Sequence, residues 1–412
     1  MDVTILGGGV AGVSTAIALK QNGFNVRVFE RHEAASTIGA GVVIWPNAAY
    51  VLEQLGVLNQ IAEVSGRPKG MRRVSSTGEP LGAMNLELIN SQMGYESFSI
   101  LRRDLQEVLI SKLESLGVEI EYGKSVIDIR SSNVGNSDVG NVQAGKATVL
   151  LSDPAGMKEE VSADVIIGAE GRMASQTRTY VLGDNQPVYQ GFINWIGVYE
   201  SNSSELDASL FDSSLQESSI LDYWGIGERF GIVPVGPNKA YWAGGIASKD
   251  IGDRNPEHYK DELTSIFSEW PEPVKRVIEG SPITSINKVY VHDHDPAEKW
   301  HKDNVIMIGD AAHAPLPTSG QGACQALEDA IYLAQCLSDH QHDLSSAFEQ
   351  FTTSRFQKTT SIIMAARGLA SALFNPDPHF CHARNESSKQ TDFNAAAQGM
   401  AQLWGQGLPL GV

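Results

Sequence analysis

The sequence predicts an α/β protein in which a parallel sheet, assembled from distant segments of the chain, is interleaved with a mainly antiparallel sheet and closed by C-terminal helices. Three observations predict this fold. A glycine-rich turn at residues 7–12 joins an apolar run to a helical segment. A second glycine-rich turn follows the apolar run 305–308, near the other end of the chain. Between them, residues 187–247 have the pattern of consecutive strands, rich in Trp, Tyr, Phe, Val and Ile.

The N-terminal segment has the pattern of a Rossmann-like βαβ unit. Residues 1–6 and 25–29 suit buried parallel strands, and residues 13–22 suit a helix packed on them. Glycines in a G-x-G-x-x-G turn allow the backbone to approach a pyrophosphate, which the helix N-terminus then faces. An acid at the end of the second strand can accept hydrogen bonds from ribose hydroxyls. Two such turns so far apart predict one large dinucleotide, FAD, with contacts here from Gly7, Gly9, Val10, Ala11, Gly12, Glu30 and Arg31.

Length and charge narrow the function classes. A chain of 412 residues predicts two intertwined domains rather than one core. The formal net charge of −18 repels nucleic acid and anionic membrane surfaces, so we expect no nucleic-acid partner. No apolar run approaches the roughly 18–20 residues of a membrane span. The first residues pass directly into a strand without a signal-like segment, so we expect a cytoplasmic protein.

No metal site is expected. The three cysteines, Cys324, Cys336 and Cys381, are too scattered for a zinc site or a disulfide framework. His292 and His294 would point the same way on a strand, but no third ligand is apparent in the sequence.

The alternation of segments predicts the domain boundaries. We assign the FAD-binding domain to residues 1–70, 100–185 and 282–343, and the substrate-binding sheet domain to residues 71–99 and 186–281. Residues 344–412 are predicted to form C-terminal helices and a polar tail. Within these segments we expect helices over 102–116, 322–339 and 344–373.

Three fingerprints in order give the chain a specific family resemblance. They are the turn at 7–12, the run Gly-Ala-Glu-Gly-Arg-Met-Ala-Ser at 168–175, and the run Gly-Asp-Ala-Ala-His-Ala-Pro-Leu-Pro-Thr-Ser-Gly-Gln-Gly at 309–322. The chain resembles the class A FAD-dependent monooxygenases, the p-hydroxybenzoate hydroxylase-like family. In its motifs it is similar to the urate hydroxylase, salicylate hydroxylase and zeaxanthin epoxidase types. The resemblance covers nearly the whole chain and implies the GR2-type FAD-binding fold of that family.

The resemblance implies further FAD contacts. In the third fingerprint the family aspartate binds the ribityl chain, the following helix start faces the flavin N1–C2=O edge, and a proline lies beside the reactive edge of the ring. The matching positions are Gly309, Asp310, Pro317, Gly320, Gln321, Gly322 and Ala323. Gly41, Val42 and Val43 match the loop that passes the isoalloxazine ring, and Arg102 matches an arginine that reaches FAD. Glu170 and Gly171 stand where the family has Asp-Gly, a place linked to FAD and NAD(P)H, so the longer acid leaves pyridine-nucleotide use open.

The substrate is expected on the second sheet. The stretch that holds Asn194 and Trp195, and the spacing from Arg229 to Tyr241, are similar to the urate hydroxylase type, in which an arginine and a tyrosine serve the substrate and the reaction. We therefore expect all four residues to contact the substrate and expect catalytic roles for Arg229, Tyr241 and Pro317. The same aromatic residues could instead be sheet core, with Arg229 a strand-edge charge.

The implied reaction is monooxygenation. NADH or NADPH, docking transiently, would reduce FAD, and O2 would then form a flavin C4a-hydroperoxide that delivers one oxygen atom to an aromatic or heteroaromatic small molecule. Two alternatives stay open. One is a non-oxygenating flavin reductase or dehydrogenase of the same fold. The other is a flavin-bound redox-sensing interaction protein that uses residues 361–374 as a partner- or membrane-facing helix. The sequence allows a monomer or a homodimer.

Overall fold

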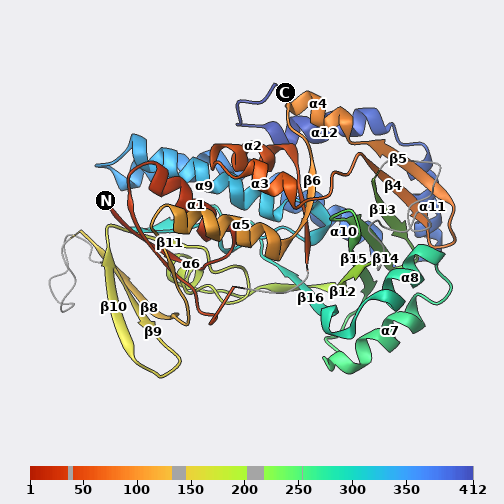
Figure 1. Ribbon diagram of the computed structural model, residues 1–412, viewed down its shortest axis with the longest axis horizontal. Coiled ribbons are helices and arrows are strands. Elements are labelled where there is room, and N and C mark those ends of the chain that lie inside the picture. The colour runs from red at the N-terminus through yellow and green to blue at the C-terminus, as the bar shows by residue number, and fades with distance from the viewer. Residues whose placement is uncertain (36–39, 132–144, 202–217, 253, 412) are drawn as a thin grey trace.

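The computed structural model describes residues 1–35, 40–131, 145–201, 218–252 and 254–411, and it confirms the α/β architecture (Figure 1). A mostly parallel sheet has the strand order β17-β18-β11-β1-β2-β7. Its strands are β1 (Asp2–Leu6), β2 (Asn25–Phe29), β7 (Ile120–Glu121), β11 (Val165–Gly168), β17 (His301–Lys302) and β18 (Val305–Met307). The edge strand β17 runs antiparallel to β18, and the other neighbours pair in parallel.

Helices surround this sheet, and the two glycine-rich turns meet at its edge. The helices are α1 (Val10–Gln21), α2 (Pro46–Gln54), α3 (Leu58–Glu63), α5 (Arg102–Ser115), α6 (Gln176–Leu182) and α9 (Gly322–Asp339). Helix α1 packs against both α5 and α9. A Cβ atom added at Gly309, in the second turn, would lie 2.8 Å from the Cβ of Ala11 in the first. The two turns therefore meet in space, because β1, β11 and β18 are neighbours in the sheet.

Two smaller sheets extend the first domain. Strands β8 (Ser125–Ser131), β9 (Ala147–Ser152) and β10 (Lys158–Ala163) form an antiparallel sheet, and residues 132–144 between β8 and β9 lie outside the described chain. Strands β3 (Gly41–Ile44) and β6 (Phe98–Leu101) form an antiparallel ribbon. In Figure 1, β6 lies between α5 of the first domain and the strands of the second.

The second domain is a seven-stranded sheet in the order β16-β12-β15-β14-β13-β4-β5. Its strands are β4 (Gly70–Ser75), β5 (Pro80–Asn85), β12 (Val188–Glu200), β13 (Ser219–Trp224), β14 (Glu228–Pro234), β15 (Lys239–Ala247) and β16 (Asn287–Asp293). Helices α7 (Tyr259–Ile266) and α8 (Glu272–Gly280) close a core with one face of it. Helix α4 (Glu87–Met93) follows β5 and contacts α12 (Phe393–Gly405). We call the opposite face, which carries Arg229 and Tyr241, the inner face.

One predicted boundary is wrong. The sequence places residues 287–293 in the returning FAD-binding segment 282–343, but β16 pairs antiparallel with β12 and so belongs to the second sheet. The physical reason is that β16 is an edge strand, and only its pairing partner reveals which sheet it joins.

The C-terminal region corrects a second expectation. After α10 (Leu344–Leu373), the predicted polar tail instead forms α11 (Pro378–Lys389) and α12. Asp377 and Asp392 cap these helices by accepting hydrogen bonds from backbone N–H groups. The caps stabilise the two helices although their sequences are polar. Ile362, Ile363 and Leu373 of α10 are buried, so one face of the apolar segment 361–374 packs on the protein's own core, whereas Met364 on the other face is 54% exposed. Among the described residues, no helix is both long and apolar enough to cross a membrane.

Candidate cofactor and substrate site

In the first glycine-rich turn, two glycines are packed against backbone atoms and a third borders open space. A Cβ at Gly7 (φ +113°) would overlap the carbonyl oxygen of Ala169, and a Cβ at Gly12 would overlap that of Gly7. At Gly9, by contrast, the nearest atom to an added Cβ is an Nη of Arg102 at 4.0 Å. Gly9 is the N-cap of α1, and no side chain of the described chain caps this helix. Free N–H groups near Val10 and Ala11, with Arg102 beside them, suit a phosphate.

Glu30 lies at the end of β2, as predicted. Its carboxylate accepts hydrogen bonds from the N–H of Gly8 (2.8 Å) and the N–H of His32 (2.9 Å), and the His32 ring lies 2.6 Å away. Burial opposes ionisation of Glu30, but these hydrogen bonds outweigh it and lower the pKa of the carboxyl below its usual value. Glu30 is therefore an anion at neutral pH, as an acceptor for ribose hydroxyls must be. Arg31 beside it is exposed.

Helix α5 holds the turn from the other side, through a residue that sequence reasoning missed. The amide of Gln106 donates to the carbonyl oxygen of Gly8 at 2.6 Å. Gln106 lies one helical turn after Arg102, whose own N–H donates to the carbonyl of Ala40 at 2.7 Å. The i, i+4 spacing of these two polar residues was the signal available in the sequence.

Asp310 follows β18 in the short η3 turn (Gly309–Ala311). Nε and Nη2 of Arg172, in the middle fingerprint, donate to the same carboxylate oxygen of Asp310 at 3.1 and 2.7 Å. The other oxygen has no hydrogen-bond partner in the described chain and faces the start of α9 at Gly322. Arg172 thus orients Asp310 and leaves one oxygen for a hydroxyl donor. Sequence reasoning missed Arg172, although it directly follows Gly171.

The start of α9 is locked to β3. The indole N–H of Trp45 donates to the carbonyl of Gly320 at 3.0 Å, and the thiol of Cys324 contacts the carbonyl of Val43 at 3.4 Å. The loop 41–43 and the helix start at 320–323 therefore lie side by side, as a flavin bound by both requires. Pro317 begins the short η4 turn (Pro317–Ser319) and is exposed.

Gln321 and Asn47 form a buried amide pair beneath this junction. The amide nitrogen of Asn47 donates to the side-chain oxygen of Gln321 at 3.0 Å and to Glu328 at 2.7 Å. The Gln321 side-chain nitrogen and the Asn47 side-chain oxygen are buried without a hydrogen-bond partner in the described chain. Such unsatisfied groups are costly, which is consistent with a polar ligand at the helix start.

Glu170 faces its own domain. Its two carboxylate oxygens accept from the N–H of Gln176 (3.0 Å), the N–H of Thr177 (3.0 Å) and the hydroxyl of Ser175 (3.0 Å). Burial raises the pKa of Glu170, and these hydrogen bonds oppose the rise. The extra methylene relative to aspartate is thus used to cap α6. The departure from the family pattern has a structural role here.

Taken by their chemistry, these groups fit FAD. An uncapped helix start beside Arg102 suits the pyrophosphate, the anion Glu30 suits a ribose, and Asp310 has an oxygen free for a ribityl hydroxyl. The 41–43 loop and the 320–323 helix start offer backbone to a flat ring.

The inner face of the second sheet brings together three of the four predicted substrate residues. Asn194 and Arg229 both pair with Gly245, and Tyr241 pairs with Val233 two positions beyond Gly231. Trp195 does not join them, which corrects the prediction. It points to the opposite face, where its indole N–H donates to Glu262 at 3.2 Å. Neighbouring residues on a strand point to opposite faces, so Asn194 and Trp195 cannot serve one site.

Arg229 is held at one end. Its Nε donates to Oδ1 of the buried Asp222 at 2.6 Å, and Oδ2 of Asp222 accepts from the indole N–H of Trp224 at 2.8 Å. The two terminal nitrogens of Arg229 have no hydrogen-bond partner in the described chain. Sequence reasoning missed Asp222, which is two residues before Trp224 on β13 and therefore points to the same face of the sheet.

Tyr241 lies against the loop 41–43, which we call the flavin-side loop because the family resemblance predicts that it passes the flavin ring. A Cβ at Gly41 would overlap the Tyr241 ring, so glycine lets β3 lie against it. Burial raises the pKa of Tyr241 to about 12, with Arg229 acting in the opposite direction. The Tyr241 hydroxyl has no hydrogen-bond partner among the described residues.

Small residues separate Arg229 from Tyr241. Gly231 pairs with Ala243 in the row between them, and an added Cβ at Gly231 would find only backbone oxygens, 4.0 Å away. Four residues of strand span about 13 Å, enough for one aromatic ring between two long side chains. The inner face thus has a bare floor flanked by a guanidinium and a phenol.

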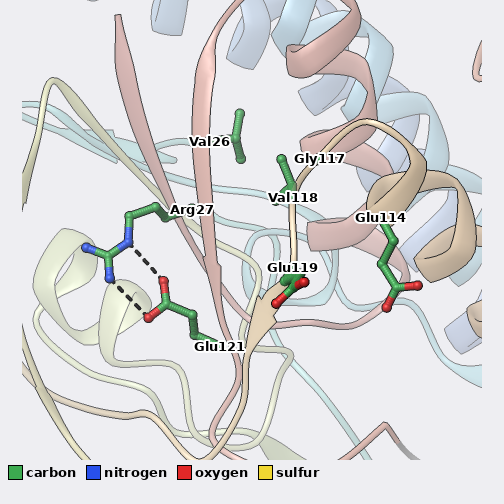
Figure 2. Close-up of a pocket in the computed structure, with 7 residues that line it drawn as sticks. All are labelled: Val26, Arg27, Glu114, Gly117, Val118, Glu119 and Glu121. Carbon is green, nitrogen blue, oxygen red and sulfur yellow. Dashed lines mark hydrogen bonds and ion pairs between the residues drawn. The ribbon is translucent and has the colours of Figure 1, made fainter.

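A hollow of about 730 Å³ lies elsewhere, at the edge of the parallel sheet (Figure 2). Its polar lining is Arg27, Glu114, Glu119 and Glu121, and Arg27 donates to both oxygens of Glu121 at 2.9 and 3.0 Å. The remaining carboxylates repel phosphate, so this hollow does not suit a dinucleotide.

The two histidines considered as metal ligands make backbone contacts. His292 contacts the carbonyl of Tyr290, and His294 contacts that of Arg172 at 2.8 Å. The described residues contain no cluster of three or more groups suited to a metal ion.

Comparison with known proteins gives consistent matches. The model of a family described as "FAD binding domain" matches residues 1–355. FAD-dependent urate hydroxylase of Mycolicibacterium vanbaalenii is 30% identical over 383 residues, covering 92% of this chain and 90% of the relative. 6-Hydroxynicotinate 3-monooxygenase of Pseudomonas fluorescens is 27% identical, covering 92% and 94%. The structure of Klebsiella pneumoniae HpxO with FAD and uric acid has a TM-score of 0.86 at 24% identity, covering 99% and 97%, which shows a shared fold.

Proposed function

This chain belongs to the FAD binding domain family, and we propose that it is an FAD-dependent, NAD(P)H-consuming monooxygenase that inserts one oxygen atom of O2 into an aromatic or heteroaromatic small molecule. One observation carries the assignment of its substrate site. The terminal nitrogens of Arg229 and the hydroxyl of Tyr241 have no partner in the described chain, and they flank the bare floor at Gly231. Convergent polar groups around an open apolar surface are typical of small-molecule sites.

The residues that would hold FAD come from both glycine-rich turns. Gly9, the α1 start and Arg102 would bind the pyrophosphate, and Glu30 a ribose. Asp310, oriented by Arg172, would bind the ribityl chain. The loop 41–43, Pro317 and the 320–323 helix start would contact the ring system. When bound, FAD supplies the redox chemistry and the activation of O2.

Arg229 would bind and stabilise the ring in its anionic form. Electrophilic oxygen transfer needs an electron-rich ring, and a phenolate or enolate is richer than the neutral ring. A guanidinium lowers the pKa of a hydroxyl bound to it. Asp222 fixes the orientation of Arg229 through Nε, so that its terminal nitrogens stay directed at the ring.

Tyr241 would act as a neutral hydrogen-bonding group. Because burial raises its pKa to about 12, it carries its proton throughout the neutral range. It therefore cannot serve as a phenolate base, and it can donate a hydrogen bond to the ring oxygen. Its place against Gly41 would keep the substrate beside the flavin-side loop.

NADH or NADPH would dock transiently. Both carboxylate oxygens of Glu170 accept hydrogen bonds from the start of α6, so we assign Glu170 no direct contact with the nucleotide.

The experiment is a substrate screen with NADH and NADPH, using phenols, hydroxypyridines, hydroxyquinolines and purines. We expect at least one ring to accelerate NAD(P)H oxidation and to gain an oxygen that is labelled under 18O2. Arg229→Gln should abolish the acceleration, whereas Tyr199→Phe, on the opposite face of the same sheet, should retain it. NAD(P)H oxidation without labelled product from any ring would contradict the proposal.

A further inference from the structure

A second arginine lies on the inner face, beside the proposed substrate site. Arg73 of β4 pairs with Asp222 of β13, which pairs in turn with Gly231, so these three residues share one row and one face. Its guanidinium carbon lies 4.9 Å from the ring centre of Trp224 and 5.1 Å from that of Phe393. Two aromatic rings thus fix the position of the guanidinium.

The nearby carboxylate is already committed. One oxygen of Asp222 accepts from Arg229 and the other from the indole of Trp224. Arg73 has no hydrogen-bond acceptor in the described chain. A guanidinium carries five N–H donors, and leaving them unmatched in a half-buried place is unfavourable.

A third arginine shows what a satisfied guanidinium looks like here. The guanidinium carbon of Arg384, on α11, also lies near Trp224, 5.2 Å from the ring centre. It donates to the carbonyls of Ala372 (3.0 Å) and Gly225 (2.9 Å) and to the side chain of Asn385. Arg384 therefore spends its N–H donors on backbone and side-chain oxygens, whereas Arg73 contacts only the faces of Trp224 and Phe393 among the described residues.

The charge around Trp224 is unbalanced. Within the part of the chain that the structure describes, the guanidiniums of Arg73, Arg229 and Arg384 all interact with the same carboxylate, that of Asp222. Burial lowers the pKa of Arg73, Asp222 raises it and Arg229 lowers it, so Arg73 and Arg229 repel each other across this face. In a chain with a net charge of −18, such a local excess of positive charge favours an anion at this place.

We propose that Arg73 is a specificity-determining residue that binds an anionic substituent, a carboxylate, on the ring whose oxygen is held by Arg229. This inference rests on the proposed function. The planar guanidinium matches a carboxylate in a paired geometry, and its stacking between Trp224 and Phe393 holds it in one orientation. Arg229 would then serve the reacting ring and Arg73 would select acids over their neutral analogues.

Binding to the FAD-loaded protein tests the proposal. The probes are 4-hydroxybenzoate and 6-hydroxynicotinate, each compared with its carboxamide, and binding is followed by the flavin absorption spectrum. We expect the wild type to bind each acid about 10- to 100-fold more tightly than its amide. Arg73→Gln should remove this preference and leave amide binding within about threefold. Arg73→Lys, which keeps the charge without the planar fork, should retain part of it.

Arg72→Gln is the matched control, because Arg72 is the adjacent residue and points to the opposite face of β4. It should keep the wild-type preference for acids. FAD content and thermal unfolding of each variant show whether it folds. Equal binding of acid and amide by the wild type, binding of neither probe pair, or the same loss in Arg72→Gln and Arg73→Gln would overturn the inference.

The two proposals fail separately. If a ring that lacks the carboxylate is oxygenated as efficiently as the corresponding acid, the proposed function stands and Arg73 has no role in specificity. Tight binding of acids that depends on Arg73, with no oxygenated product from any ring, would leave the anion site and refute the monooxygenase.

Discussion

Glu328→Gln should destabilise the protein through a buried charge cluster under the α9 start. Glu328, Asp329, Arg355 and Lys358 are each at most 3% exposed. Glu328 accepts from Lys358 at 2.9 Å with both oxygens, from Arg355, and from Asn47 at 2.7 Å. Asp329 accepts from Arg355 at 2.8 Å and from the N–H of Gly309 at 2.8 Å, and its carboxylate lies 2.6 Å from Nε2 of His313. The cluster therefore supports both the second glycine-rich turn and the Asn47–Gln321 pair.

The magnitude follows from the charge balance. Glutamine at 328 leaves two buried cations with one carboxylate, and breaking a buried ion pair costs about 3–5 kcal/mol. Lys358 can limit this cost by losing its proton. Burial lowers the pKa of Lys358, and Glu328 opposes this in the wild type, so the proton is held less tightly once Glu328 is neutral. With an unfolding entropy near 2.1 cal/mol/K per residue, the loss corresponds to a fall in Tm of about 3–6 °C.

Unfolding measured at several pH values tests this reasoning. Burial lowers the pKa of Lys358 and Glu328 raises it, so in the variant the folded pKa of Lys358 falls further below that of the unfolded chain. A lowered lysine pKa makes the penalty shrink as pH rises, by about 1.4 kcal/mol per unit. The deficit relative to wild type should therefore be smaller at pH 9 than at pH 7. Glu63→Gln, at an exposed position of α3, should change neither value.

A double variant supplies the decisive comparison. Glu328→Gln with Lys358→Met restores the balance of one cation to one anion, Arg355 with Asp329. We expect the double variant to lose less stability than the sum of the two single variants. Strictly additive losses, or an unchanged Tm in Glu328→Gln, would refute the reasoning.

Three further predictions concern the site. Tyr241→Phe should lower turnover roughly 10- to 100-fold by removing one hydrogen bond to the reacting ring. Because the pKa of Tyr241 is about 12, the dependence of turnover on pH between 6 and 9 should keep its wild-type shape. If the variant loses a rise or fall that the wild type shows in that range, Tyr241 is not a neutral phenol there. Gly41→Ala should push the Tyr241 ring aside and weaken ring binding in a spectral titration, with a stability cost of about 1–3 kcal/mol; unchanged binding would argue against this contact. In Glu170→Asp the shorter carboxylate should not reach the start of α6, which lowers the free energy of unfolding by about 1 kcal/mol. The rate of flavin reduction by NAD(P)H should stay unchanged. An altered rate would assign Glu170 a direct role.

Much of the cofactor side was predictable from local patterns. The turn at residues 7–12, the acid at Glu30 and the Asp310 turn each follow a strand and precede a helix or loop within a short stretch of sequence. Arg172 and Gln106 escaped notice because their partners, Asp310 and the carbonyl of Gly8, lie about 100 or more residues away. No local pattern states such a contact.

The substrate side depended on strand pairing. Asn194, Arg229 and Tyr241 were predicted to meet and do share a face, whereas Trp195 was assigned to the wrong face. With a period of two, an error of one residue reverses the direction of a side chain. Asp222 and Arg73 were not anticipated, because β4 and β13 are neighbours only through a parallel pairing across about 150 residues.

The sequence by itself determined the α/β fold, the family and the positions of the two glycine-rich turns, since glycine geometry, strand–helix alternation and capping are local properties. Only the tertiary structure decided which cations are satisfied and which are free. Arg384 is paired with backbone carbonyls and Arg229 is anchored at one end by Asp222, whereas the partners of Arg73 among the described residues are aromatic rings. The physical reason is that a charge is satisfied by the acceptors around it in space, and those acceptors come from strands and helices that folding brings together.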